Sequence, residues 1–133
     1  MSAEDVELVT RWFKGLGQGE LTPEICDPEI VIRNWDESPA RGPYHGHEGL
    51  ARWWADIADA IEELHFELNE ATDVGDGRVL TTQKIVGRFR LTGIELDFPW
   101  GSIVTVREGK ILSATGYATP GQATKAADPS ESA

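Results

Sequence analysis

The clearest pattern of apolar and polar positions lies between residues 46 and 61. Apolar side chains recur there at intervals of three and four residues: Leu50, Trp53, Trp54, Ile57 and Ile61. That spacing places them on one face of an amphipathic helix. Two adjacent tryptophans on one face need a broad concave surface to pack against, so we expect the rest of the chain to supply a curved sheet.

A second amphipathic helix is predicted at the start of the chain, and it ends in the glycine-rich stretch 15–19. Its apolar stripe is formed by Val6, Val9, Phe13 and Leu16, with Leu8 and Trp12 beside it. A short helix is predicted from Thr22 to about Cys26. Proline suits the first helical position at Pro23, and Pro28 ends the segment.

Much of the remaining chain alternates with a period of two, which indicates strands. Five strands are predicted, over residues 29–35, 64–69, 78–91, 94–106 and 110–118. Pro99 and Gly101 fall inside the fourth strand, where we expect a bulge or a sharp bend because proline cannot donate to the sheet. From Pro120 onward there is no apolar stripe, so residues 120–133 are predicted to form a flexible tail.

This order of elements is typical of an α+β fold, in which helices are segregated from an antiparallel sheet. We expect a strongly bent antiparallel sheet wrapped around the N-terminal helices, with a hollow at its open end. At 133 residues the chain is long enough for one domain with a sizeable core. We assign that domain to residues 1–119.

Twelve basic residues against 23 acidic ones give the chain a net charge of −11. Such a surface repels phosphate groups and anionic lipids. The sequence also has neither a basic stripe nor a glycine-rich phosphate motif. We therefore expect no nucleic acid and no membrane partner, whereas a neutral or cationic small molecule, or a protein, remains open.

Cysteine usage and the lack of long apolar runs bear on the compartment. No run of 18 apolar residues occurs, so no membrane span is expected. The acidic start lacks the basic and apolar regions of a signal peptide, and a single cysteine, Cys26, cannot form an internal disulfide. The sequence therefore predicts a cytoplasmic location, with Cys26 as a buried structural residue rather than a nucleophile.

Four stretches of the chain carry a family resemblance: E-L-V-T-R-W-F-K-G-L-G-Q-G-E-L, D-P-E-I-V-I-R-N, Y-H-G-H-E-G-L-A-R-W-W and V-R-E-G-K-I-L. Together they resemble the SnoaL-like branch of the NTF2-like, or ketosteroid-isomerase-like, superfamily over residues 4–119. The resemblance implies a cone-shaped α+β fold, usually dimeric through the outer sheet face, with an apolar pocket inside the cone. It does not imply one function, because this scaffold hosts isomerases, cyclases, hydrolases and binding modules.

The resemblance also assigns the family's catalytic positions. The isomerase branch implies an oxyanion-stabilising tyrosine at Trp12, a carboxylate base at Asn34 and a protonated carboxylic acid at Ser102. The cyclase and epoxide-hydrolase branches imply an aspartate at about Gly116. None of the four residues present is an acid or a base at neutral pH, so they do not support proton abstraction next to a carbonyl.

What remains is a predicted pocket with flat aromatic walls, a few polar groups and small residues that leave room. Its predicted lining is Trp12, Asn34, Tyr44, His45, Trp54, Phe98, Trp100, Ser102, Ala114 and Gly116. No cofactor is expected. His45, His47 and Glu48 are a weak zinc signal, since the third histidine, His65, lies on another strand; no metal site is predicted.

Three functions stay open on the sequence alone. The first is a domain that binds an apolar small molecule, with catalysis undecided. The second is an isomerase, cyclase or hydrolase of a polyketide-, steroid- or terpenoid-like substrate, with His45 and Tyr44 as catalytic candidates. The third is a dimeric protein-interaction module with a filled pocket. A homodimer is expected through Ser113, Thr115 and Tyr117, which share the outer face of the last strand.

Overall fold

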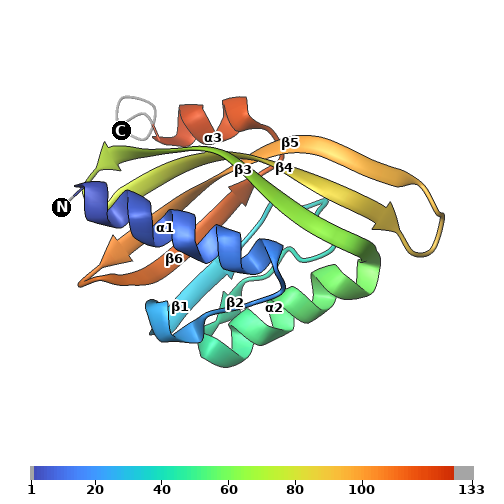
Figure 1. The fold of residues 1–133 in the computed structure, drawn as a ribbon, viewed down its shortest axis with the longest axis horizontal. Coiled ribbons are helices and arrows are strands. Elements are labelled where there is room, and N and C mark those ends of the chain that lie inside the picture. Colours follow the sequence, from blue (N-terminus) through green and yellow to red (C-terminus); the bar gives the residue numbers. More distant parts are fainter. Residues whose placement is uncertain (1, 128–133) are drawn as a thin grey trace.

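The computed structural model describes residues 2–127, and Figure 1 shows a curved sheet with helices on both sides. Along the chain the elements are α1 (Ser2–Gly17), the short 3-10 helix η1 (Pro23–Ile25), β1 (Cys26–Arg33), β2 (Tyr44–His45), α2 (Gly46–Ala60), β3 (Ile61–Gly75), β4 (Arg78–Phe89), β5 (Glu95–Arg107), β6 (Lys110–Tyr117) and α3 (Pro120–Ala127). The predicted α+β class is confirmed.

The six strands form one unclosed sheet in the order β2-β1-β6-β5-β4-β3. Strands β3 to β6 form the predicted antiparallel meander. The sheet as a whole is mixed, because β1 runs parallel to β6, with Ile32 opposite Ala114. Helix α2 carries the chain from one edge of the sheet to the other, and the four-stranded meander then returns β6 to the side of β1 in the same direction.

Helix α2 spans the gap between the two edges of the sheet and contacts both β1 and β3. Its first turn lies directly on the edge strand β2, which the sequence did not predict. A Cβ at Gly49 would lie 2.8 Å from the backbone carbonyl carbon of Tyr44, so only a glycine permits this approach. His47 Nε2 lies 2.9 Å from the carbonyl oxygen of Cys26 and links the start of α2 to β1.

Strand β3 begins immediately after α2, at Ile61, and is longer than the predicted segment 64–69. Its second half is largely exposed, so no apolar alternation marked it in the sequence. Pairing with β4 holds this half in place, with three shifts of register along the ladder. The short-range pattern therefore underestimated a strand that depends on its neighbour.

A bulge or a sharp bend was expected around Pro99, and the bulge is absent. The register between β4 and β5 is continuous there, with Lys84 opposite Pro99 and Thr82 opposite Gly101. Strand β6 pairs with β5 only from Gly101 onward. The proline thus occupies a stretch of β5 that has a neighbour on one side only, where a missing donor costs little.

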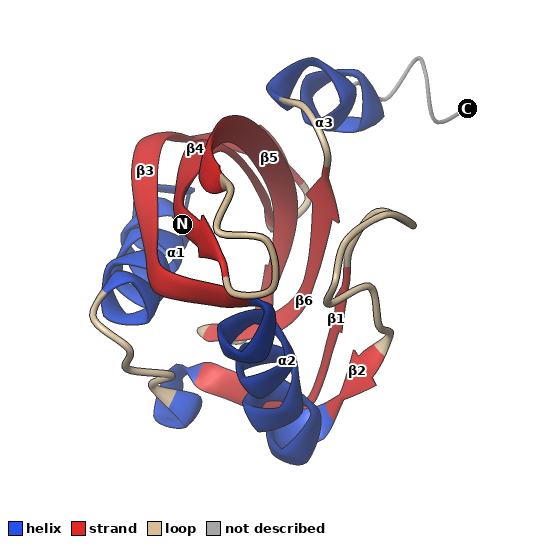
Figure 2. Cartoon of the chain, turned by 90° about the vertical axis from the view of Figure 1, so that its right-hand side faces the viewer, coloured by secondary structure: helices blue, strands red, loops and turns tan. Residues whose placement is uncertain are grey.

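The predicted flexible tail is wrong for residues 120–127, which form α3 on the outer face of the sheet (Figure 2). Ala123 and Ala127 are buried, and a Cβ added at Gly101 would lie 2.7 Å from that of Ala123. Arg78 Nη2 donates to the carbonyl oxygen of Ala127 at 3.2 Å. The sequence pattern did not predict this helix, because its buried face consists of alanines. The rest of the predicted tail, residues 128–133, lies outside the described residues.

The core fills the concave side of the sheet and is rich in aromatic side chains. Trp12 packs against Trp53 with 6.1 Å between ring centroids, and Phe13 against Trp100 with 6.3 Å. Phe66 lies 5.6 Å from Trp100. Rings from α1, α2, β3 and β5 therefore meet in one cluster inside the curved sheet.

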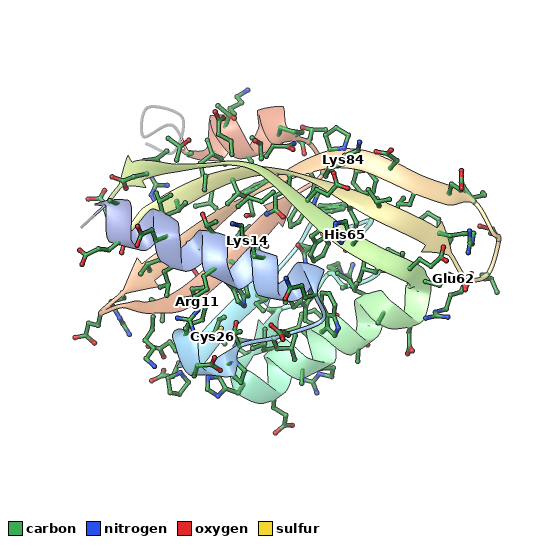
Figure 3. All side chains as sticks on the ribbon, in the orientation of Figure 1. Arg11, Lys14, Cys26, Glu62, His65 and Lys84 are labelled. Carbon is green, nitrogen blue, oxygen red and sulfur yellow. The ribbon has the colours of Figure 1, made fainter. Side chains whose placement is uncertain are left out.

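Charged side chains lie on the outside of the molecule (Figure 3). Lys84 pairs with Asp97 at 3.2 Å across the outer face of the sheet. Arg88 pairs with Glu62 at 3.3 Å and with Glu63 at 2.9 Å at the start of β3. Among residues 2–127, no helix is long and apolar enough to cross a membrane.

Candidate functional site

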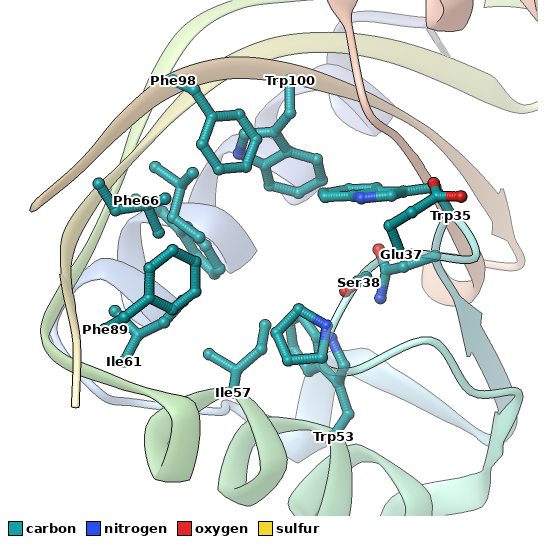
Figure 4. Close-up of a pocket in the computed structure, with 14 residues that line it drawn as sticks. Trp35, Glu37, Ser38, Trp53, Ile57, Ile61, Phe66, Phe89, Phe98 and Trp100 are labelled. Carbon is teal, nitrogen blue, oxygen red and sulfur yellow. The ribbon is translucent and has the colours of Figure 1, made fainter. Parts of the chain in front are cut away.

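An open cavity of about 220 Å³ lies at the mouth of the curved sheet, where Figure 4 shows side chains arranged around a hollow. Its walls come from α2, β3, β4, β5 and the loop after β1. The lining consists of Asn34, Trp35, Glu37, Ser38, Pro39, Trp53, Ile57, Ile61, Phe66, Ile85, Phe89, Leu96, Phe98 and Trp100. Most of these side chains are apolar, and six of them are aromatic.

The inward direction of these side chains follows from the local geometry of each element. On β5, Leu96, Phe98 and Trp100 alternate with outward residues and so line one wall together. On α2, Trp53 and Ile57 lie one turn apart and form the floor. Regular spacing on rigid elements therefore builds most of the cavity.

The loop after β1 closes one side of the cavity and is held by Asn34. The Asn34 backbone N–H donates to the carbonyl oxygen of Arg41 at 2.8 Å, and its side-chain Nδ2 donates to that of Ala40 at 2.8 Å. The N–H of Ser38 donates to the carbonyl oxygen of Trp35 at 3.0 Å. These bonds fold the loop back on itself and hold the Trp35 indole beside the cavity.

The inner end of the curved sheet is almost completely filled. A void of about 10 Å³ remains there, lined by Trp12, Phe13, Ile32, Asn34, Trp53, Trp100, Ser102, Ala114 and Gly116. That volume is at the lower limit for a single water molecule. Three of its lining residues, Asn34, Trp53 and Trp100, also line the larger cavity, so the two spaces share a wall.

Polar groups are buried around the inner end. The Thr81 and Ser102 hydroxyl oxygens lie 2.6 Å apart, and Gln83 Nε2 donates to Thr81 Oγ1 at 2.8 Å. In the part of the chain that the structure describes, four buried side-chain nitrogen or oxygen atoms have no hydrogen-bond partner: Nε1 of Trp12, Trp53 and Trp100, and Oε1 of Gln83. None of these groups exchanges a proton at neutral pH. The inner end is therefore polar in places but contains no acid or base.

The comparisons with known proteins agree with this architecture. A family model described as a SnoaL-like domain matches residues 9–114. The chain belongs to the SnoaL-like family. No curated protein is similar enough to the chain to count as a match.

Solved structures share the fold of this SnoaL-like domain at low sequence identity. An NTF2-like protein from Burkholderia thailandensis E264 is 17% identical with a TM-score of 0.79, covering 94% of this chain and 98% of that one. A protein with a ketosteroid isomerase-like fold from Catenulispora acidiphila DSM 44928, in complex with trimethylamine, is 16% identical with a TM-score of 0.73 and 85% coverage of both chains. TerC, co-crystallised with polyporic acid, is 14% identical with a TM-score of 0.74, covering 85% and 89%.

The four positions that the resemblance matched to catalytic groups all line the small inner void: Trp12, Asn34, Ser102 and Gly116. Ala114 joins them on the same wall. A Cβ at Gly116 would collide with Asn34 Oδ1 and lie 3.2 Å from the Trp100 ring, so the wall already touches its neighbours. The SnoaL-like domain thus brings these positions together but leaves no room for a substrate among them.

Tyr44, one of the two catalytic candidates, lines neither space. It is 7% exposed, and its hydroxyl donates to Asp56 Oδ2 at 2.6 Å. Burial and the bonded Asp56 carboxylate raise the pKa of Tyr44 to about 12. Tyr44 therefore joins β2 to α2 and remains protonated at neutral pH.

His45 and Trp54, also predicted to line the pocket, lie outside both spaces as well. His45 is exposed at the position before α2 and makes no side-chain cap. Trp54 is half-buried and packs behind the lining, 5.9 Å from Phe66 between ring centroids. Of the ten predicted lining residues, the larger cavity contains Asn34, Phe98 and Trp100.

Sequence reasoning missed most of the cavity wall, for two reasons. Trp53 and Trp54 are adjacent in sequence and about 100° apart around the helix, and the apolar spacing alone does not decide which one faces the cavity. Phe66 and Phe89 were detectable from strand parity, because each lies at an inward position of an alternating segment. Trp35 was assigned to the end of the predicted strand 29–35, whereas β1 ends at Arg33, and the loop residues 36–39 carry no periodic signal.

No metal or nucleophile site emerges from the described part of the chain. Among residues 2–127 no three His, Cys, Asp or Glu side chains come close enough to hold a metal ion. Cys26 is 1% exposed, and burial raises the pKa of its thiol to about 12. A thiol with that pKa is not a nucleophile at neutral pH.

Proposed function

We propose that this SnoaL-like domain binds a small apolar molecule in the 220 Å³ cavity at the mouth of its sheet. The observation that carries the proposal is the contrast between this open, aromatic-lined cavity and the filled inner end. Concave apolar pockets with a few polar groups are the usual form of small-molecule sites. The cavity lies below the range of about 300–1,000 Å³ for typical ligand pockets, which favours a ligand of one or two rings.

Two relatives in fold support small-molecule binding on this scaffold, since one was solved with trimethylamine and another with polyporic acid. Binding rather than catalysis is favoured by the groups present. Asn34 and Ser38 offer hydrogen bonds at the cavity wall, but the only ionisable residue in the lining is Glu37, at the exposed rim. The two catalytic candidates, Tyr44 and His45, lie outside the cavity.

The test fills the cavity and compares the result with the same substitution elsewhere. Leu96 is a half-buried wall residue, whereas Leu91 is 97% exposed at the tip of the same hairpin. Isothermal titration calorimetry with neutral one- and two-ring molecules such as indole, coumarin and camphor should detect binding to the unmodified protein. Leu96→Trp should weaken binding at least about tenfold, because the larger side chain occupies part of the cavity and excludes at least a methylene-sized part of the ligand. Leu91→Trp should leave binding unchanged. The proposal fails when no small molecule with an apolar body binds, whatever its charge, or when Leu96→Trp binds as tightly as the unmodified protein.

The expected homodimer is also part of this proposal. Ser113, Thr115 and Tyr117 alternate with the inward residues of β6 and are only partly exposed within one chain. Helix α3 covers the neighbouring Gly101, so an isologous contact would lie beside that helix. Sedimentation equilibrium at micromolar concentration should give twice 14.6 kDa, and a mass near 14.6 kDa would contradict the dimer.

We also propose a cytoplasmic location, supported by the lone, buried and unpaired Cys26. Fractionation of native cells should recover the protein with cytoplasmic markers, and recovery with exported proteins would contradict this location.

A further inference from the structure

The charges around the cavity are distributed unevenly. Among its 14 lining residues there is no lysine, arginine or histidine, and Glu37 is the only ionisable one. Two arginines at this end of the sheet are engaged elsewhere: Arg88 with Glu62 and Glu63, and Arg90 with Glu62 at 3.8 Å and the carbonyl oxygen of Ala58 at 3.0 Å. A carboxylate or phosphate in the cavity would therefore lose its hydration without gaining a counter-ion.

Aromatic rings supply the opposite preference. Trp35, Trp53, Phe66, Phe98 and Trp100 all line the cavity. Figure 4 shows Trp35 seen nearly edge-on above the hollow, with one face of its ring turned toward it. The negative face of an indole attracts a cation within about 6 Å of the ring, more strongly where water is excluded.

The ring pairs hold these faces in fixed positions. Trp35 lies 6.2 Å from Trp100 at 49° and 6.2 Å from Phe98 at 81°. Tilted and edge-to-face contacts leave ring faces available instead of stacking them against each other. A rigid set of rings needs little rearrangement to receive a ligand, so less affinity is lost in ordering it.

We infer that the ligand of this cavity carries a protonated or quaternary amine on an apolar body. This rests on the proposed function and names its ligand class. The apolar body fills the space between α2 and the sheet, and the ammonium group contacts the Trp35 face near the rim, where Glu37 adds a carboxylate. The net charge of −11 attracts the same class of ligand from solution.

The test uses three probes of matched shape, measured by isothermal titration calorimetry on the full chain. They are meta-trimethylammonio-benzyl alcohol, the neutral meta-tert-butylbenzyl alcohol, and the anionic meta-tert-butylbenzoate. We expect the cation to bind about tenfold more tightly than the neutral probe, since a desolvated cation–π contact is worth that order of discrimination. The anion should bind more weakly than both.

Variants assign the preference to particular groups. Trp35→Leu should reduce the cation-to-neutral ratio to about threefold or less, because the ring face is lost while an apolar side chain remains. Glu37→Gln should reduce it about twofold and weaken its salt dependence, since Glu37 is exposed and screened. Glu70→Gln removes the same charge from an exposed position of β3 outside the cavity lining, and should leave the ratio unchanged.

The outcomes separate this inference from the proposed function. A neutral probe that binds as tightly as the cation overturns the amine preference but leaves small-molecule binding intact. A tenfold preference that persists in Trp35→Leu also overturns it, because the ring face then plays no part. When none of the three probes binds, the proposed function fails together with the inference. Circular dichroism of each variant confirms that the comparison is made between folded proteins.

Discussion

The inner end and the mouth of the curved sheet are lined by similar residues but differ in packing. At the inner end, α1 inserts Trp12 and Phe13 opposite the small residues of β6, and only about 10 Å³ stays empty. At the mouth no residue of α1 lines the cavity, and about 220 Å³ remains open. At the inner end the rings pack against small residues and fill the space between helix and sheet. At the mouth the rings surround the cavity and leave its centre open.

The difference bears directly on function. The positions that other branches of the family are expected to use for proton transfer lie at the inner end, around Trp12 and Asn34. Here that end serves as core. The open cavity lies at the mouth. Its wall includes residues of α2 and of the loop after β1, and no residue of α1. This arrangement fits the proposed binding function, which needs open space at the mouth and no acid or base at the inner end.

The largest expected effect compares the same truncation at the two ends. Phe13 is 3% exposed at the inner end, and Phe98 is half-buried at the mouth. Phe13→Ala should lower the free energy of unfolding by about 3–5 kcal/mol, because it opens a cavity in close-packed core. Phe98→Ala should cost only about 1–2 kcal/mol, because its ring already borders open space. Urea denaturation of both variants measures the difference.

Ligand affinity should respond in the opposite order. Phe98→Ala removes part of the cavity wall and should lower ligand affinity. Phe13 lies outside the cavity lining, so Phe13→Ala should lower ligand affinity less. Equal losses of stability for the two variants would mean that the mouth is packed as tightly as the inner end, and the comparison would not hold.

A smaller effect is expected from adding one methyl group to the wall of the inner end. Gly116→Ala would push against Asn34 and Trp100 and disturb the bond from Asn34 to Ala40. Overpacking of this kind costs about 1–3 kcal/mol. Thermal unfolding should therefore shift to lower temperature, and ligand affinity should fall as well, because Asn34 holds the loop that carries Trp35.

The matched control for that variant is Gly121→Ala in α3. A Cβ at Gly121 meets only Thr119 Oγ1 at 3.9 Å, and alanine favours a helix. This variant should be as stable as the unmodified protein or slightly more so. A Gly116→Ala protein of unchanged stability would show that the inner end has free space after all.

Much of the fold was predictable from the sequence, because apolar residues recur with the period of a helix or of a strand. The predicted α2 face and the strands β4 to β6 follow from residues such as Leu50, Ile57 and Trp100. What escaped depends on distant partners. The two residues of β2 acquire their conformation from β1, and the alanine face of α3 becomes apolar surface only against Gly101.

The site was less accessible than the fold for a related reason. Residue identity placed tryptophans inside the sheet, but it did not decide which of them close the inner end and which surround the cavity. That depends on how far α1 reaches, which is a matter of three-dimensional packing. The loop that supplies Trp35 is shaped by hydrogen bonds of Asn34, and a pattern of apolar and polar positions does not predict such bonds.

The smallest expected effect concerns Tyr44, which holds the helix under the mouth without lining it. Tyr44→Phe removes the hydroxyl that donates to Asp56 and should cost about 1 kcal/mol of stability. Because α2 supplies Trp53 and Ile57 to the cavity, a small change in ligand affinity would show how far the mouth depends on this bond. Unchanged affinity would mean that the loop after β1 and the sheet determine the shape of the mouth without this bond.

The same residue adds a pH dependence whose sign follows from its raised pKa. The folded protein keeps the Tyr44 proton up to a pKa of about 12, whereas an unfolded tyrosine loses it near pH 10. The stabilisation is thus complete below about pH 10 and is lost as the pH rises toward about 12. Tyr44→Phe should flatten the fall in unfolding free energy over that window. Part of the slope should remain, because the buried thiol of Cys26 also has its pKa raised to about 12. An unchanged slope in Tyr44→Phe would mean that the phenol is not held by Asp56 in solution.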